Sequence, residues 1–319
     1  MTEHQAVKQT ADAKMLDGAR VAGEIKAEVR QGVDEFVQTY NSPPALAVVR
    51  VGDDAASLVY VRNKIRTSEE LGFRSEHHAL PASTSEAELL DLVSQLNGRD
   101  DVDGILVQLP LPSGIDEKKV IESIDPAKDV DGFHPLNIGR LVAGQTEAAP
   151  CTPAGIIELL KRSNIEMRGA HACVVGRSHI VGRPMAQLLL QHDATVTICH
   201  SRTIDLASIT RQAHILVVAI GRAAFIRGEH IKPGAVVVDV GMNKLTDATM
   251  IDELFDDVEA ARRHANFEKR GYTLIGDVHP AEAMKRAGWL TPVPGGVGLL
   301  TVAMLMRNTL HAARRRLTI

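Results

Sequence analysis

Short stretches that favour strands alternate with longer amphipathic stretches through the first half of the chain. The amphipathic stretches repeat apolar side chains every three or four residues, which predicts helices that bury one face. The pattern predicts helices over 19–40, 55–71 and 85–96, and strands over 46–51, 75–80 and 104–107. Because strands that alternate with helices favour a mostly parallel sheet covered on both faces, we expect an α/β domain here.

The second half continues the alternation with short, strongly apolar runs. These predict strands over 172–175, 194–199, 215–219 and 235–240, with helices over 153–162 and from Gly182 onward. Three of the strands end at a glycine, namely Gly176, Gly221 and Gly241. This arrangement is typical of a doubly wound, Rossmann-like parallel sheet, which binds ligands at the carboxyl ends of its strands.

The division of the chain into two domains follows from these patterns. Residues 1–14 are polar and predict a loose extension, and residues 15–150 form the first α/β domain. Residues 125–150 are rich in Gly, Pro and Asp and are interpreted as the irregular junction, after which residues 151–298 form the second domain. A final helix over 299–315 is expected to join the first domain. The charged stretch 247–270 predicts a surface helix with a solvated face.

Composition excludes several classes of function. The chain has 319 residues, 45% of them hydrophobic, which suits two cores rather than one. Aromatic residues are only 3% and the formal net charge is −4, so no nucleic-acid partner is expected. No apolar stretch is long enough to span a membrane, and the first 14 residues resemble neither a signal peptide nor a mitochondrial presequence. Cys151, Cys173 and Cys199 lack metal-ligand spacing, so we expect a cytoplasmic protein without a metal site.

The turn from Gly176 to Gly182 is the first candidate for ligand binding. A strand, a glycine turn and a helix N-terminus together present backbone N–H groups and a partial positive charge to a phosphate. The spacing differs from the G-x-G-x-x-G dinucleotide pattern, so an ordinary strand-to-helix turn is the alternative. A second strand at the distance expected of a β-α-β unit favours nucleotide binding.

The end of that second strand indicates which nucleotide is bound. Proteins that prefer NAD usually place an acidic residue there to bind the ribose hydroxyls. This sequence has His200, Ser201 and Arg202 instead, with Arg177 in the first turn. Two cations and a hydroxyl suit the added 2′-phosphate of NADP. The alternative is that both arginines are solvated surface charges.

Tyr60 and Lys64 are candidates for proton transfer. They lie four residues apart on one predicted helix and therefore share a face. Neighbouring groups can tune the pKa of a lysine, which makes such a pair useful for acid–base chemistry. The alternative is an amphipathic helix whose Tyr packs and whose Lys reaches water. Short-chain dehydrogenases contain the same pair, but after the nucleotide turn and within one domain, so that family fits poorly.

Three further segments carry candidate ligand contacts. Gln108 is a single polar side chain at the end of the apolar strand 104–107. Asp131 follows in the junction, where it accepts hydrogen bonds from a heterocycle or only forms the turn before Gly132. The loop Thr291-Pro-Val-Pro-Gly-Gly-Val-Gly298 combines stiff prolines with bare glycine backbone, which lets a flat ligand approach closely.

Several motifs, taken together and in order, resemble bifunctional methylenetetrahydrofolate dehydrogenase/methenyltetrahydrofolate cyclohydrolase. They cover roughly residues 15 to 313. The motifs are 51–72 with Ser57, Tyr60 and Lys64; 103–112; 128–132; 150–153; 176–178 with 181–184; and 291–298.

The resemblance implies a folate held in the cleft between the domains, NADP on the second domain, and a homodimer. It also implies conversion of methylenetetrahydrofolate to formyltetrahydrofolate in one-carbon metabolism, which serves purine biosynthesis. The implied catalytic residues are Tyr60, Lys64, Gln108 and Asp131; the implied folate contacts are these together with Val107, Leu109, Pro294, Gly295, Gly296, Val297 and Gly298. The implied cofactor contacts are Thr152, Gly176, Arg177, Ser178, Ser201 and Met242.

The chain departs from the usual pattern of this family in two places. Leu299-Leu300 stands where a Pro-Met pair is common, and segment 247–270 is longer than in many relatives. Two other classes stay open: another NADP-linked oxidoreductase that acts on a small carbonyl acid, and a non-catalytic nucleotide or folate sensor. The complete set of Tyr60, Lys64, Gln108 and Asp131 argues against a sensor.

Overall fold

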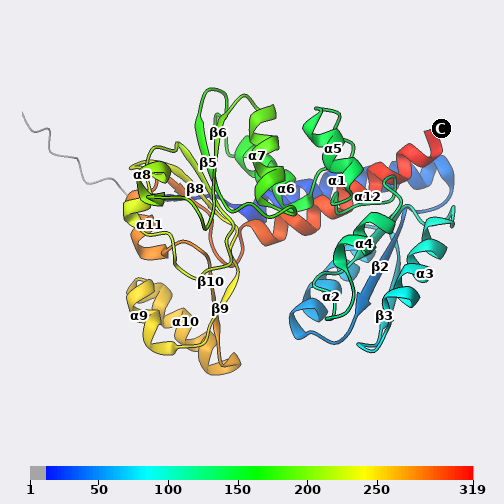
Figure 1. Ribbon diagram of the computed structural model, residues 1–319, viewed down its shortest axis with the longest axis horizontal. Helices are drawn as coiled ribbons and strands as arrows, with labels where there is room; N and C mark the ends of the chain where they lie inside the picture. The colour runs from blue at the N-terminus through cyan, green and yellow to red at the C-terminus, as the bar shows by residue number, and fades with distance from the viewer. Residues whose placement is uncertain (1–11, 319) are drawn as a thin grey trace, which may run out of the picture. The chain divides into compact units, whose positions relative to one another are not determined.

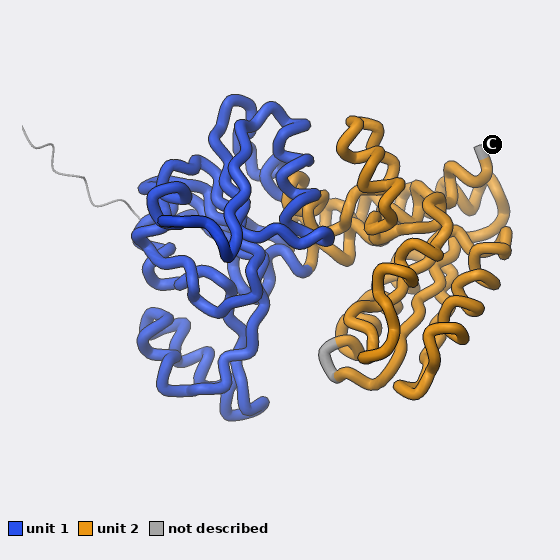
Figure 2. The backbone as a smooth tube through the Cα atoms, in the orientation of Figure 1, with its two compact units in different colours: residues 1–18, 159–298 blue, residues 19–158, 299–319 orange. Residues whose placement is uncertain are grey.

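The computed structural model describes residues 12–318 and divides the chain into two compact units (Figure 2). Unit 1 comprises Met1–Gly18 and Leu159–Gly298, and unit 2 comprises Ala19–Glu158 and Leu299–Ile319. Among the described residues, no helix combines the length and the apolar character that a membrane span requires.

Unit 2 is built on a three-stranded parallel sheet. The central strand β2 (Ala45–Val51) pairs with β3 (Arg74–Leu80) on one side and β4 (Gly104–Val107) on the other. All seven residues of β2 are buried, because helices cover both faces of the sheet (Figure 1). The helices of this unit are α1 (Gly18–Tyr40), α2 (Ala55–Glu70), α3 (Glu86–Asn97), α4 (Glu117–Ser123), α5 (Pro135–Val142), α6 (Cys151–Arg162) and α12 (Val297–Thr318), of which α1, α6 and α12 begin or end in unit 1.

Unit 1 is built on a six-stranded parallel sheet with the order β1-β11-β8-β7-β5-β6. The chain runs from β5 outward to β6 and then returns to the other side of β5 to form β7, so the winding reverses between β5 and β7. This is the switch point of a doubly wound sheet, and the predicted fold class is confirmed. The strands are β1 (Lys14–Met15), β5 (His171–Val175), β6 (Thr195–Cys199), β7 (Ile215–Val218), β8 (Val236–Asp239) and β11 (Trp289–Leu290), and the helices packed around them include α7 (Gly182–Gln191), α8 (Leu206–Thr210) and α11 (Pro280–Arg286).

A small lobe extends from this sheet in unit 1 (Figure 1, yellow and orange). It consists of the antiparallel pair β9 (Asn243–Leu245) and β10 (Thr273–Ile275), connected by α9 (Ile251–Leu254) and α10 (Asp257–Arg270). The lobe has its own apolar cluster, formed by Leu245, Ile251, Leu254, Phe255, Ala260 and Ile275.

The structure corrects three sequence-based expectations. Lys14 belongs to β1, which pairs with β11, rather than to a loose extension; residues 1–11 of that extension lie outside the described residues. The junction 125–150 is not wholly irregular, because it contains α5, which begins at Pro135. His134 caps this helix by accepting a hydrogen bond from the N–H of Leu136. The stretch 247–270 forms a short 3-10 helix (Ala248–Met250) and two α-helices rather than one surface helix. The two α-helices are separated where Phe255, with an extended backbone, packs into the lobe core and Asp256 caps α10.

Two buried aspartates fix the loops at the carboxyl edge of the unit 1 sheet. Asp277 accepts hydrogen bonds from the backbone N–H groups of Ile220, Gly221 and Arg222 at 2.7–2.9 Å, and from the side-chain amide of Asn243 at 2.9 Å. Asp239, at the end of β8, accepts from the N–H of Asp277 at 2.9 Å. Burial raises the pKa of Asp239 to about 7, although the backbone hydrogen bonds that its own carboxylate accepts act to lower it.

We expect Asp277→Ala to destabilise unit 1 by about 3 kcal/mol or more, because three backbone N–H groups lose their acceptor. The midpoint of thermal unfolding should fall by roughly 6–12 °C for a unit of this size. Trp289 in β11 is the single tryptophan of the sequence, so its fluorescence reports this unit. Asp257→Ala, at an exposed position on α10, is the control. Equal midpoints for the two variants would contradict the assigned role of Asp277.

Candidate functional site

Lys64 and Gln108 meet in unit 2 through a direct hydrogen bond. The Lys64 ammonium donates to Oε1 of Gln108 at 2.9 Å, although the two residues come from α2 and from the end of β4. Lys64 is only 8% exposed. Asp54 positions this helix, because its carboxylate caps α2 by accepting from the N–H of Ser57 at 2.8 Å. A nearly buried ammonium at the carboxyl end of a parallel strand is placed for proton transfer to a ligand.

The amide of Gln108 has a defined orientation. Its Nε2 donates to the carbonyl of Leu109 at 2.6 Å, which leaves Oε1 to accept from Lys64. The backbone N–H of Gln108 donates to the carbonyl of Val49 in β2 at 2.8 Å, and the Leu109–Pro110 peptide is cis. The side chain is therefore fixed at both ends, and it holds one proton of Lys64 in a single direction.

Tyr60 lies one helical turn before Lys64 on α2 and is 39% exposed. Partial burial raises the pKa of its hydroxyl. Because a phenol with a raised pKa remains protonated near neutrality, Tyr60 offers a hydrogen-bond donor next to Lys64.

Asp131 is held between two residues whose backbones are fixed. The carbonyl of Val130 accepts from the side-chain amide of Asn308 in α12 at 2.9 Å and from the thiol of Cys151 at 3.3 Å. On the other side, Gly132 has φ +75°, and a side chain there would collide with the backbone of Ala149. The carboxyl group of Asp131 is therefore positioned by backbone packing.

The carboxyl group of Asp131 is poised to gain a proton near neutral pH. Burial raises its pKa to about 6. The positive charge of Lys64 acts in the opposite direction, and the negative charge of Asp129 adds to the rise. Asp131 lines a small apolar cavity with Val107 and Leu109, the two predicted folate contacts that flank Gln108. Unit 2 thus brings together four side chains predicted from sequence to act in one reaction.

Sequence reasoning assigned no supporting role to the residues that hold this cluster in place. Asp129 accepts from the backbone N–H groups of Gly132, Phe133 and His134. Lys128 is buried and donates to three carbonyls at the end of α3, those of Leu96, Asn97 and Arg99. Asp followed three residues later by Gly is a recognisable side-chain-capped turn. The contacts of Lys128 and Asn308 depend on residues far along the chain, so no local signal reveals them.

Gly176 and Gly182 form a tight turn in unit 1 after β5. Gly176 has φ +129°, and a side chain there would collide with the carbonyl of Ala219. Gly182 begins α7 and lies against the carbonyl of Gly176, so a side chain there would also collide. The Ser178 hydroxyl accepts from the N–H groups of Val181 and Gly182 at 3.2 and 3.3 Å. The turn lies at the switch point of the sheet and opens onto a helix N-terminus, the geometry that binds phosphate.

The side chains expected to recognise a 2′-phosphate are exposed beside this turn. Arg177, Ser201 and Arg202 are all exposed, and the Arg177 guanidinium has no ion-pair partner among the described residues. The turn after β6 is fixed by hydrogen bonds between His200 and Thr203. No acidic residue occupies positions 200–203.

The loop Thr291–Gly298 lies in unit 1 and is shaped by close backbone contacts. A side chain on Gly296 would come within 2.6 Å of the carbonyl of Pro292, and Gly295 has φ +101°. The Val293–Pro294 peptide is cis, and Val297 is buried. The exposed side chain of Met242 lies near Gly298, so the structure brings this predicted cofactor contact next to the loop.

Thr152, the remaining predicted cofactor contact, lies in the first turn of α6 in unit 2. Its hydroxyl is 2.8 Å from that of Thr301 in α12. Either hydroxyl can donate, so Thr152 retains hydrogen-bonding capacity for a ligand.

A doubly wound sheet with a phosphate-binding turn, together with a separate lysine–amide–carboxyl cluster, defines a nucleotide-linked enzyme that also performs proton transfer. Residues 16–131 match the catalytic domain of tetrahydrofolate dehydrogenase/cyclohydrolase, and residues 150–317 match the NAD(P)-binding domain of the same family. The chain belongs to the tetrahydrofolate dehydrogenase/cyclohydrolase family, and the sequence-based recognition is confirmed.

Curated relatives match over nearly their whole length. The bifunctional protein FolD of Solibacter usitatus is 54% identical over 95% of this chain and 98% of that protein. The protein of the same name from Koribacter versatilis is 53% identical over the same shares of both chains. Enzymes of this family are oxidoreductases and hydrolases of folate one-carbon units, as the motifs predict.

Solved structures also match over nearly the whole length of both chains. The bifunctional methylenetetrahydrofolate dehydrogenase/cyclohydrolase of Campylobacter jejuni superposes with a TM-score of 0.85 at 41% identity, over 95% of this chain and 99% of that one. The Trypanosoma brucei enzyme, solved with NADP and an inhibitor, gives 0.87 at 37% identity, over 97% and 100%.

The raised pKa of Asp131 predicts a specific pH dependence of stability. Between its ordinary pKa of 3.8 and the folded value of about 6, the folded protein binds more protons at Asp131 than the unfolded chain. The contribution of Asp131 to the free energy of unfolding is therefore fully present below about pH 4, and it is lost as the pH rises through about 6. Relative to wild type, Asp131→Asn should gain up to about 3 kcal/mol between these limits.

Urea unfolding of both proteins from pH 4 to 7 measures this difference, with Asp91→Asn at an exposed position as the control. If the free energies of unfolding of wild type and Asp131→Asn change in parallel with pH, the pKa of Asp131 is not raised in the folded protein.

Proposed function

We propose that the chain oxidises methylenetetrahydrofolate with NADP and then hydrolyses the methenyl product to formyltetrahydrofolate. The observation that carries this proposal is the hydrogen bond from Lys64 to Gln108, with Asp131 beside it in unit 2. In this assignment unit 2 provides the catalytic folate residues and unit 1 provides the nucleotide site. The loop 294–298 and residues Val107 and Leu109 line the folate site.

The first step requires orientation more than proton transfer. The one-carbon bridge of the substrate loses a hydride to NADP, which serves as the hydride acceptor, and the folate nitrogens supply the electron pair. The half-buried side chain of Asp131 accepts hydrogen bonds from N–H groups of the folate heterocycle. Tyr60 covers the ring from α2. Holding the bridge at a fixed distance accelerates such a step without a catalytic acid or base.

The second step requires a proton carrier. Water adds to the methenyl carbon and loses one proton, which leaves a hydroxyl group on that carbon. The hydroxyl then loses its proton as the formyl C=O forms and the carbon–nitrogen bond breaks, and the departing ring nitrogen gains a proton, so one proton is released overall. Lys64 is suited to carry this proton because it is nearly buried and is oriented by Gln108. The Gln108 carbonyl directs the ammonium toward the substrate side of β4, and the Tyr60 hydroxyl provides a neighbouring donor.

Selectivity for NADP rests on the exposed side chains beside the phosphate-binding turn. Arg177 and Ser201 can both contact a 2′-phosphate, and no carboxylate is present at positions 200–203 to repel it. Gly176 and Ser178 contribute backbone and hydroxyl contacts, and Thr152 and Met242 are the remaining cofactor contacts in this assignment.

The cellular setting is part of the same proposal. We place the enzyme in the cytoplasm, as a homodimer that supplies formyl groups for purine biosynthesis and binds no nucleic acid. All three cysteines are free and buried, which suits a reducing compartment. The net charge of −4 gives no basic surface for a polynucleotide. Sedimentation equilibrium tests the homodimer, and a monomer at micromolar concentration would contradict it.

The deciding experiment follows methylenetetrahydrofolate with either NADP or NAD at the wavelengths of the reduced nucleotide and of the methenyl intermediate. We expect the absorbance of the reduced nucleotide to rise with NADP and the methenyl signal to stay low because hydrolysis follows. An enzyme active on hydroxy acids but not on the folate would refute the proposal.

Lys64→Met should separate the two reactions. The substitution keeps the aliphatic stem and removes the proton, so cyclohydrolase activity should fall by about 100- to 10,000-fold while dehydrogenase activity remains measurable. The methenyl intermediate should then accumulate. Lys118→Met, at a position 80% exposed on α4, should leave both rates unchanged. Full hydrolysis by Lys64→Met, or equal loss of both activities, would exclude Lys64 as the specific proton carrier.

Arg177→Ala should reduce affinity for NADP but not for NAD. Loss of a charge-assisted contact with the 2′-phosphate costs about 1.5–3 kcal/mol, or roughly ten- to a hundredfold in affinity. Fluorescence titration with each nucleotide measures this effect, with Arg211→Ala at an exposed position after α8 as the control. Equal losses for NADP and NAD would refute the assignment.

A further inference from the structure

We propose that Arg263, in the lobe of unit 1, is a positioning residue for the folate-lining loop 294–298. This inference rests on the proposed function, because the importance of the loop follows from that reaction. The sequence predicted a solvated charged face for segment 247–270, and the structure corrects this expectation at Arg263, which is 7% exposed.

The guanidinium of Arg263 joins three parts of unit 1. Its Nε donates to Glu259 Oε1 at 2.6 Å within α10, and its Nη1 donates to the carbonyl of Leu274 in β10 at 2.6 Å. Its Nη2 donates to the carbonyl of Val293 at 2.7 Å. The same group stacks 4.6 Å from the ring centre of Phe255. Charge-assisted hydrogen bonds of this length are strong, and the planar guanidinium fixes their directions relative to one another.

The loop has few ways to be held at this point. Pro292 and Pro294 have no backbone N–H and cannot donate hydrogen bonds that would hold the loop. The carbonyl of Val293, which lies between them, is therefore an important point of attachment. Thr291 is held on the sheet side, where its N–H donates to the carbonyl of Val237 at 3.1 Å. The contact with Arg263 fixes the next part of the loop, immediately before Gly295 and Gly296.

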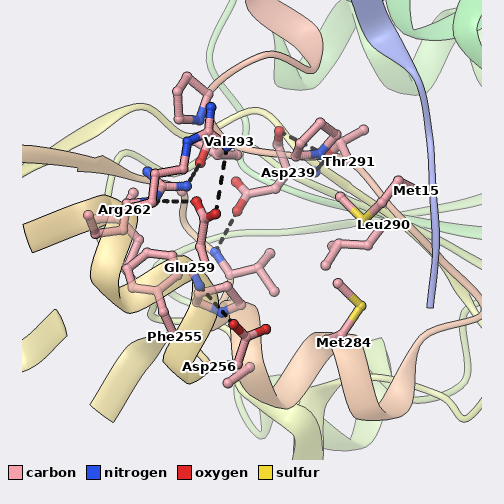
Figure 3. Close-up of a pocket in the computed structure, with 18 of the residues that line it drawn as sticks. Met15, Asp239, Phe255, Asp256, Glu259, Arg262, Met284, Leu290, Thr291 and Val293 are labelled. Atoms are coloured by element: carbon pink, nitrogen blue, oxygen red, sulfur yellow. Dashed lines mark hydrogen bonds and ion pairs between the residues drawn. The ribbon is translucent and has the colours of Figure 1, made fainter. Parts of the chain in front are cut away.

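A cavity of about 410 Å³ lies where the lobe faces the loop, as Figure 3 shows. Phe255 and Glu259 line it from the lobe, and Thr291 and Val293 line it from the loop. Because this space is not filled by side chains, apolar packing holds the loop only in part. At this cavity the guanidinium of Arg263 extends from the lobe to the carbonyl of Val293. The position of the loop therefore depends on the position of α10.

The lobe therefore has a role in the reaction without contacting the reacting atoms. If the carbonyl of Val293 is released, the glycines that follow it lose their fixed path, and the surface presented to the folate becomes less ordered. Binding of the folate should weaken, while the nucleotide turn at Gly176 and Gly182, fixed by its own backbone contacts, should be unaffected.

Steady-state kinetics of Arg263→Met test this role. We expect KM for methylenetetrahydrofolate to rise about tenfold, the value for loss of one strong hydrogen bond. KM for NADP should change by no more than about twofold, which is well below the effect of losing one hydrogen bond, because the nucleotide turn does not depend on Arg263. Arg263→Lys keeps one charged donor and should restore part of the folate affinity. Lys269→Met, at an exposed position on the same helix, is the control and should change neither constant.

Glu259→Gln provides a second test if Arg263→Met does not fold. It keeps the guanidinium but weakens the contact that orients it, so the folate KM should rise about threefold. Trp289 fluorescence during unfolding establishes that each variant is folded. Unchanged folate KM in both variants, or equal increases in both KM values, would overturn the positioning role. If wild type does not turn over the folate at all, the proposed function fails and this inference falls with it; if wild type is active and the variants match it, only this inference fails.

Discussion

The hydrogen bonds accepted by Asp277 fix the carboxyl edge of the unit 1 sheet. The Asp277 carboxylate accepts hydrogen bonds from three successive N–H groups after β7, and the backbone N–H of Asp277 donates to Asp239, the last residue of β8. Both aspartates are buried, and the N–H groups of Ile220, Gly221 and Arg222 lose their protein acceptor if Asp277 moves. The loops that follow β7 and β8 are therefore set by two side chains, and the close contact of Gly176 with Ala219 depends on the loop after β7.

The cluster in unit 2 is governed by a balance between burial and attraction. Burial disfavours the charge on Asp131, whereas the ammonium of Lys64 favours it, and the resulting pKa of about 6 leaves both protonation states accessible near neutrality. Gln108 is neutral, so it can orient Lys64 without adding charge to this balance. A carboxylate at position 108 would form an ion pair with Lys64 and make proton transfer from the ammonium harder. A neutral amide at the end of β4 therefore suits the proton transfer that we propose for Lys64.

Local patterns were sufficient to predict most of the fold. The apolar runs of β5, β7 and β8 and the glycines after them predicted the doubly wound sheet, and helical spacing placed Tyr60 and Lys64 on one face. The approach of Gln108 to Lys64 was expected only through family resemblance, because 44 residues separate them. The short strand β1 was missed because two residues carry no periodicity. Arg263 was assigned to a solvated face because a charged residue in a charged helix gives no sign of burial, and its partners at Leu274 and Val293 are set by tertiary packing.

Gly176 and Gly182 contact each other through backbone atoms, and neither position tolerates a side chain. The side chains proposed to distinguish one nucleotide from another, those of Arg177 and Ser201, are instead exposed. In the proposed assignment, the turn that binds the pyrophosphate and the side chains that select the cofactor are therefore separate residues. Substitution of the exposed residues is then expected to change the cofactor preference at little cost in stability, while the backbone packing of the turn is retained.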